Sequence, residues 1–201
     1  IIMVPFAIGK IFLDKEFVIL GVVGSALSIL TIFCTAMIYA QLRTVPRWNS
    51  FLTPVLFVLY SLGGGAFLIN EGRLAAFILI LSSLLQVYAW LNGDQLFKKA
   101  VSNVESATGL GNIGKVRLLE GPHTGANYLL KEMVYIVGRK HRIRLRIIGF
   151  ILVGVLPGLI LLLFHFNLLL LILAFLMHLI GISLIRWLFF AEAEHVVGLY
   201  Y

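Results

Sequence analysis

Long apolar runs, separated by short polar segments, dominate the chain. A helix needs about 20 apolar residues to cross a bilayer, and Phe17–Leu42 carries no charge and meets that length. The charge-free stretch Ile147–Ile185 is too long for one span, and the polar break at residues 165–167 divides it into a helical hairpin. With the two runs in between, the pattern predicts a single transmembrane domain over residues 1–201 with five full spans, near 17–42, 48–70, 74–93, 147–164 and 168–190.

Composition places the chain among integral membrane proteins. It is 61% hydrophobic and 12% charged, whereas soluble domains are roughly 45–50% apolar and about 25% charged. We therefore predict an all-α, polytopic helix bundle. The single cysteine, Cys34, excludes an internal disulfide and a cysteine-based metal site made by this chain alone.

The basic residues are distributed unevenly between the two predicted membrane faces. One face receives the 43–49 loop, the long 94–146 loop and the C-terminus. It holds all of the 16 Lys and Arg residues except Lys10, Lys15 and Arg73. Basic residues gather in cytoplasmic loops, so this face is predicted to be cytoplasmic. In such a protein the net charge of +7 indicates topology, and no nucleic-acid partner is expected.

The 94–146 loop contains a G-x-G-x-x-G match at Gly109–Gly114. A dinucleotide fingerprint needs a preceding strand within a βαβ unit, which this segment does not predict, so a flexible connector is favoured. Apolar residues at helical spacing predict an amphipathic helix near 128–138. The basic run Arg139–Arg146 suits lipid headgroups and, on a second reading, an acidic partner.

The segment Tyr39–Trp48 (YAQLRTVPRW) lies where a span meets the headgroup region. It suits an ordinary interfacial belt, in which aromatic and basic side chains anchor the helix end. It also suits the mouth of a site for an amphiphile such as a quinone, which needs an apolar slot with a few polar groups. The candidate quinone-binding residues are Tyr39, Arg43, Arg47 and Trp48.

Several residues inside the spans predict helix packing. Gly63–Gly65 allows close helix approach, and Ser82, Ser83 and Gln86 are expected to hydrogen-bond between helices. His178 lies in mid-span and suits an interhelical hydrogen bond. A haem ligand is the second interpretation, but a membrane haem needs two histidines at matched depth and the sequence has one deep histidine. No catalytic or metal-ligand set is evident in the sequence, so we expect no cofactor bound by this chain and no autonomous active site.

Three stretches resemble the dimethyl sulfoxide reductase anchor subunit family, and the resemblance covers essentially the whole chain. They are TAMIYAQLRTVPRWNS at Thr35–Ser50, VRLLEGPHTGANYLLKEM at Val116–Met133, and the ending RWLFFAEAEHVVGLYY. The second and third are similar to one branch of that family, which anchors molybdoenzymes of the sulfite-oxidising type as well as reductases such as dimethyl sulfoxide reductase. The chain departs from the pattern at Gly121, where a second proline is expected, and at Glu194, where a basic residue is common.

The resemblance implies a membrane anchor of a molybdopterin oxidoreductase in the bacterial inner membrane. Such anchors have eight transmembrane helices, so the five spans here would be the last five, with the N-terminal helices missing. They exchange electrons with the quinone pool and hold two partners, an iron–sulfur subunit and a molybdopterin catalytic subunit. The 94–146 loop would cap the docking face, with His123 as a further quinone-site residue and with docking residues Arg117, Glu120, Asn127 and Glu132.

Two other functions stay open at this point. A secondary transporter or channel fragment would fit the spans, although no internal repeat is evident and transporters usually carry a charged residue deep in a span. A pure scaffold would hold the partners without binding quinone. Solute uptake distinguishes the first alternative, and binding of a quinone analogue distinguishes the second.

Overall fold

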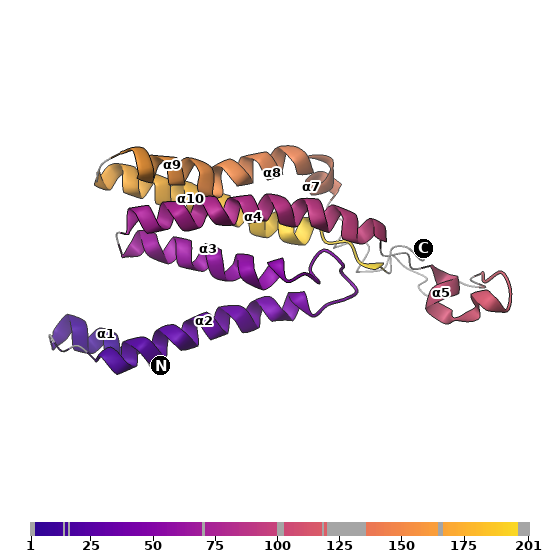
Figure 1. Cartoon of the computed structure of the whole chain (residues 1–201), viewed down its shortest axis with the longest axis horizontal. Coiled ribbons are helices and arrows are strands. Elements are labelled where there is room, and N and C mark those ends of the chain that lie inside the picture. The colour runs from indigo at the N-terminus through magenta and orange to yellow at the C-terminus, as the bar shows by residue number, and fades with distance from the viewer. Residues whose placement is uncertain are drawn as a thin grey trace.

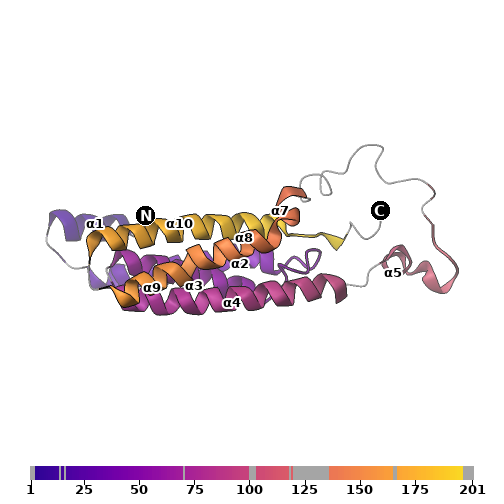
Figure 2. The same ribbon diagram turned by 90° about the horizontal axis from the view of Figure 1, so that it is seen from above.

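The computed structural model describes residues 3–13, 15, 17–69, 71–99, 103–117, 119, 136–164 and 167–196. In these residues the chain forms helices and no strand, so the predicted helical bundle is confirmed. Figure 1 shows the long helices lying side by side, and Figure 2 gives the same bundle from above. The sequence and the structure together identify a multi-pass membrane protein.

Five helical segments follow the predicted spans. They are α2 (Val18–Ala40), α3 (Leu52–Leu68), α4 (Gly72–Lys99), the continuous run of α8 (Arg142–Phe150), η2 (Ile151–Val155) and α9 (Leu156–Leu163), and α10 (Leu168–Ala191). Four of these are long and apolar enough to cross a membrane, and α3 is a shorter apolar helix of 17 residues. The shorter elements are α1 (Met3–Phe12), α5 (Val104–Thr108), η1 (Leu110–Asn112) and α7 (Ile136–Lys140).

Two helices extend beyond the apolar runs that predicted them. The helix α4 continues through Asp94 to Lys99, and α8 begins at Arg142 rather than near residue 147. In α8 the added residues include Arg142, Arg144 and Arg146, and arginine is a good helix former. In α4 the helix continues through Asp94, whose carboxylate pairs with Arg47 and Arg146. The charge boundary therefore marks where the membrane crossing ends, while the backbone hydrogen bonds continue.

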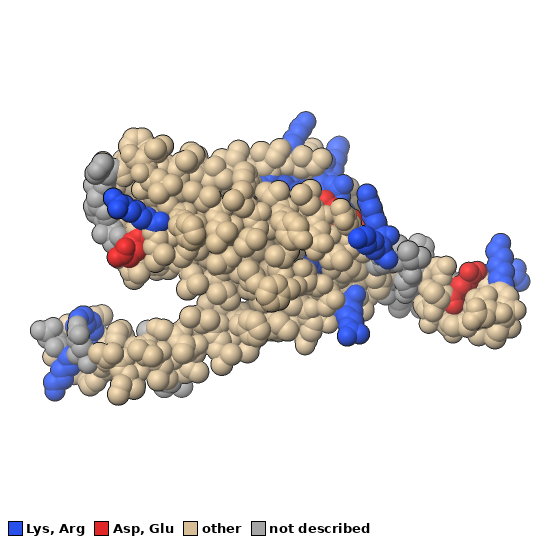
Figure 3. Space-filling view, in the orientation of Figure 1, with Lys and Arg blue, Asp and Glu red and all other residues tan. Residues whose placement is uncertain are grey.

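The inner bundle consists of α3, α4, the α8–η2–α9 run and α10, which pack against one another. The helix α2 packs on α3 outside this bundle, and only Gly24 and Ala36 of α2 are buried. Its apolar side chains face outward, as expected for a helix covered by lipid. Figure 3 shows Lys and Arg side chains gathered mainly at the end where α4 and α8 carry their charged residues.

Small residues allow the backbones of the inner bundle to approach closely. A Cβ placed on Gly181 of α10 would lie 2.3 Å from the backbone nitrogen of Val153. A Cβ on Gly154 would lie 2.4 Å from the carbonyl oxygen of Leu79 on α4. The packing role predicted for the glycine run in α3 is observed at Gly63, where an added Cβ would meet the Leu79 side chain at 2.7 Å, but not at Gly65, where nothing lies within 4 Å.

Some polar side chains inside the spans form hydrogen bonds between helices, and others form them within their own helix. His178 makes the predicted interhelical hydrogen bond, with Nδ1 donating to the carbonyl oxygen of Val153 at 2.6 Å. Ser82 and Ser83 do not bond between helices as expected, because both hydroxyls donate to the carbonyl oxygen of Leu79 in their own helix. A serine hydroxyl in a helix reaches the carbonyl one turn earlier without any partner helix.

The loop between α4 and α7 is described only in part. Residues Val104–Thr108 form α5, which is closed by Gly109 in the left-handed region with φ of 70°. A short helix therefore precedes the G-x-G-x-x-G match, where a dinucleotide site would need a strand. Of the amphipathic helix expected near 128–138, only the end falls within the described residues, as part of α7.

Candidate functional site

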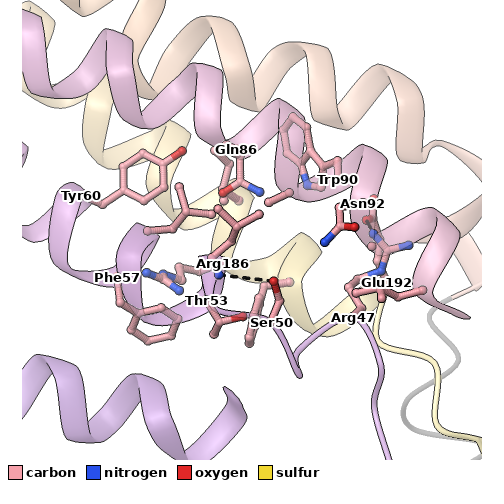
Figure 4. A pocket seen from close by; sticks show the side chains of 17 residues that line it. Arg47, Ser50, Thr53, Phe57, Tyr60, Gln86, Trp90, Asn92, Arg186 and Glu192 are labelled. Carbon is pink, nitrogen blue, oxygen red and sulfur yellow. Dashed lines mark hydrogen bonds and ion pairs between the residues drawn. The ribbon is translucent and has the colours of Figure 1, made fainter. Parts of the chain in front are cut away.

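A polar pocket lies inside the bundle near its basic end. It encloses about 50 Å³ and is walled by α3, α4, α10 and the residues just before α3. Figure 4 shows its polar side chains converging from these elements. The polar lining residues are Arg47, Ser50, Thr53, Tyr60, Gln86, Asn92, Arg186 and Glu192, and the apolar lining includes Leu56, Phe57, Trp90, Ile185 and Phe189.

Arg186 is the most unusual member of this lining. It belongs to α10 within the predicted membrane span, where a charged side chain is costly and normally has a partner. Its guanidinium lies over the ring of Phe57, with 3.5 Å from Cζ to the ring centroid. None of the ion pairs within the described part of the chain includes Arg186.

Tyr60 reaches the same pocket from α3. The residue is only 4% exposed, and its hydroxyl has no hydrogen-bond partner among the described residues. Gln86, from α4, is also buried and lines the pocket. Buried polar groups are normally satisfied, so the arrangement is suited to a guest that offers hydrogen bonds.

Four charged side chains form an ionic cluster, defined here as Arg47, Asp94, Arg146 and Glu192. Arg146 donates to Asp94 at 2.7 and 2.9 Å and to Glu192 at 2.8 and 2.6 Å. Arg47 donates to Asp94 at 2.5 Å and lies 3.4 Å from Glu192. Two cations and two carboxylates thus compensate each other, and the cluster joins the α2–α3 loop, α4, α8 and the C-cap of α10.

Local packing keeps the two arginines of the cluster in place. The Arg47 side chain lies against Gly93, where an added Cβ would approach Nη1 to 3.0 Å. Arg146 lies over Trp90, with 5.5 Å from Cζ to the ring centroid. Arg47 and Glu192 also line the polar pocket, so the ionic cluster forms the end of the pocket that faces the basic end of the bundle.

The structure brings together three of the four quinone-site residues predicted near the second span. Trp48 stacks on Phe189 at 5.2 Å between centroids and donates from Nε1 to the Phe189 carbonyl oxygen at 2.9 Å. Tyr39 meets Trp48 edge-on at 5.3 Å. Arg47 lines the pocket, whereas Arg43 is exposed and absent from its lining. Tyr39 and Trp48 therefore form an aromatic wall behind the pocket, beside Phe189.

The remaining predicted residues belong to the long loop. Arg117 is exposed on that loop and is absent from the pocket lining. Glu120, His123, Asn127 and Glu132 lie outside the described residues. Their proposed roles in docking and in quinone binding therefore stay predictions.

Sequence reasoning did not identify Tyr60, Asp94, Arg146, Arg186 and Glu192 as site residues. One signal for Arg186 was present, since the apolar stretch WLFFA follows it and shows that the helix continues past the charge. The acids Asp94 and Glu192 had no comparable signal. They are about a hundred positions apart, and only the packing of α4 against α8 and α10 through Arg146 reveals their relation.

Comparison with known proteins supplies one informative relationship. The chain is 32% identical over 202 residues to a protein from Allochromatium vinosum that is named as a subunit of sulfite dehydrogenase. The match covers 91% of this chain but 60% of that relative, so the chain spans less than two thirds of the relative's length. No protein-family model and no solved structure matches the chain. The described helices thus belong to a chain that is similar, over most of its length, to one component of a sulfite dehydrogenase.

Proposed function

We propose that this chain is the membrane anchor of a sulfite-oxidising molybdopterin complex and exchanges electrons with the quinone pool. The observation that carries the proposal is the 32% identity, over 91% of the chain, to a protein named as a sulfite dehydrogenase subunit. The multi-pass helical bundle is consistent with an anchor, and the polar pocket within it is consistent with a quinone-reactive role. Between the two partner types suggested by the sequence, the relative's name favours sulfite oxidation over dimethyl sulfoxide reduction.

In this proposal the redox groups reside in the partner subunits. Oxidation of sulfite with one water yields sulfate, two protons and two electrons at the molybdopterin subunit. The electrons pass through an iron–sulfur subunit to a quinone, which takes up two electrons and two protons and becomes a quinol. This chain holds the partners at the bilayer and provides the place where the quinone meets the electron path.

The basic end of the bundle is proposed to face the cytoplasm and to carry the partners. The charge asymmetry supports this orientation, because basic residues are retained on the cytoplasmic side. The 94–146 loop leaves this end, between α4 and α7. The docking residues proposed from the sequence are Arg117, Glu120, Asn127 and Glu132, and His123 lies in the same loop.

Purification of the tagged protein from its native membranes in mild detergent tests the proposal. We expect molybdenum, iron and two further polypeptides to co-purify, and the preparation to reduce a short-chain quinone when sulfite is added. A protein that comes out alone and metal-free, from membranes with normal contents of both metals, would contradict it. Solute uptake by vesicles would then support a transporter, and an intact complex that does not bind quinone would support a scaffold.

A further inference from the structure

We infer that the pocket between α3, α4 and α10 binds the ring of a quinone, with Arg186 and Tyr60 donating hydrogen bonds to one of its oxygens. The identity of the ligand rests on the proposed function. The location and the chemistry of the site rest on the side chains that line it. None of the residues proposed here was among those predicted from the sequence, except Arg47 at the pocket's edge.

Arg186 distinguishes this pocket from the ionic cluster beside it. Both arginines of the cluster donate hydrogen bonds to its carboxylates, although Nη1 of Arg47, 3.4 Å from Glu192, has no hydrogen-bond partner among the described residues. Arg186 instead contacts the face of Phe57. A guanidinium inside a membrane span is normally paired or marks a ligand path. An acceptor oxygen beside Arg186 would give its guanidinium a hydrogen bond, since none to it is found among the described residues.

Tyr60 is an independent indication of a guest. Its hydroxyl is buried and lacks a hydrogen-bond partner among the described residues. Leaving such a group unsatisfied is unfavourable, because the hydroxyl loses its bonds to water and gains none in return. Because Tyr60 and Arg186 line one pocket from two different helices, a single oxygen placed between them would satisfy both.

The apolar walls of the pocket fit a flat apolar ring, which would be the part of the ligand that carries the oxygen. Phe57, Trp90 and Phe189 present aromatic surfaces, and Leu56 and Ile185 present aliphatic ones. The pocket volume of about 50 Å³ holds roughly four water molecules, which a ligand entering the pocket would displace. An apolar slot with a few convergent polar groups is the usual form of a small-molecule site.

The same arrangement suits the redox step. As two electrons arrive from the iron–sulfur subunit of the proposed complex, negative charge develops on the quinone oxygen, and Arg186 stabilises it. Two protons from water complete the quinol. The ionic cluster borders the pocket toward the basic end through Arg47 and Glu192, so this is the side from which water is expected to supply the protons.

Kinetics of the intact purified complex test the site. Sulfite oxidation is measured with a water-soluble one-electron acceptor, which bypasses the membrane subunit, and with a short-chain quinone. We expect Arg186→Gln to lower kcat/KM for the quinone at least tenfold and Tyr60→Phe to lower it several-fold, mainly through KM. Activity with the soluble acceptor should be unchanged in both variants. The matched control is Arg73→Gln, since Arg73 is exposed at the start of α4 and absent from the pocket lining.

Binding supplies a readout that does not depend on turnover. Trp90 lines the pocket, so titration with a quinone analogue should quench its fluorescence, and Trp90→Phe should remove that component. Tyr60→Phe deletes only one hydroxyl and keeps the ring, so this variant is expected to fold and a change in affinity can be assigned to the hydroxyl. If both Arg186→Gln and Tyr60→Phe keep wild-type quinone kinetics and affinity, the assignment of the quinone site to this pocket is wrong. The proposed function would be unaffected by that result. A wild-type complex that oxidises no sulfite would overturn the proposed function, and the titration would still decide whether the pocket binds a quinone.

Discussion

His178 on α10 donates a hydrogen bond from Nδ1 to the carbonyl oxygen of Val153, 2.6 Å away on η2. Four residues after Val153 is Pro157, which has no backbone N–H. An α-helical bond to the Val153 carbonyl is therefore missing, and η2 has π-helical geometry at this point. A carbonyl freed inside a membrane must find another donor. His178 provides it, which gives this histidine a structural role in the packing of α10 against η2.

A double-mutant cycle tests the relation between His178 and Pro157. His178→Leu should destabilise the bundle by about 1 kcal/mol, the size of an interhelical hydrogen bond in a membrane. In a Pro157→Ala background the helix regains an N–H that can bond Val153, so the same substitution should cost clearly less. Unfolding in mixed micelles with increasing SDS measures all four proteins. Equal costs in both backgrounds would show that Pro157 does not create the need for His178.

The ionic cluster predicts that Arg146 and Arg144, both on α8, contribute very differently to the stability of the bundle. Arg146→Ala removes the bidentate partner of Asp94 and Glu192. Within the described part of the chain it leaves Glu192, whose side chain is 3% exposed, with Arg47 as its one remaining ion-pair partner. Loss of one member of a buried pair costs about 3 kcal/mol. Arg144→Ala, two residues earlier and exposed, should change stability by less than about 0.5 kcal/mol. The midpoint of thermal unfolding in detergent, followed by circular dichroism, measures both, and similar midpoints would contradict a stabilising cluster.

The close backbone contact between α10 and η2 predicts that one methyl group added at Gly181 destabilises the bundle. Gly181→Ala would place a Cβ 2.3 Å from the Val153 backbone nitrogen, which forces α10 and η2 apart. We expect a loss of about 1–3 kcal/mol, typical of overpacking, in the same SDS titration. The control is Gly65→Ala in α3, where nothing lies within 4 Å of the added Cβ. That change should be neutral or slightly stabilising, because alanine is the better helix former.

Charge placement predicts the orientation in the membrane. A phosphatase reporter that folds only outside the cytoplasm should stay inactive when inserted after Gly114, in the basic 94–146 loop. The same reporter inserted after Glu71, in the turn between α3 and α4, should be active. An active reporter at Gly114 would contradict the proposed cytoplasmic face and the docking of partners there. Protein levels of both fusions must be compared, so that an unstable fusion is not counted as inactive.

Much of the bundle could be predicted from the sequence because the bilayer limits the choices. Backbone polar groups have no water to bond with in lipid, so a long apolar run such as Leu168–Ala191 must be helical. From the segment Tyr39–Trp48, Tyr39 and Trp48 contact each other and Arg47 lines the pocket, while the predicted position at the headgroup level stays a prediction. Helix ends were less predictable, as α4 and α8 show, because a charged residue ends an apolar run without ending a helix.

By itself, the sequence determined that the chain is a membrane-embedded helical bundle with one basic end, since length, apolarity and charge act locally along the chain. Only the tertiary structure decided which distant side chains meet. The pairing of Arg146 with both Asp94 and Glu192, and the convergence of Arg186 and Tyr60 on one pocket, depend on how the helices are rotated and ordered against one another. Close contacts such as Gly181 against Val153 fix those rotations. They join residues that are distant in the sequence, so the pattern along the chain does not reveal them.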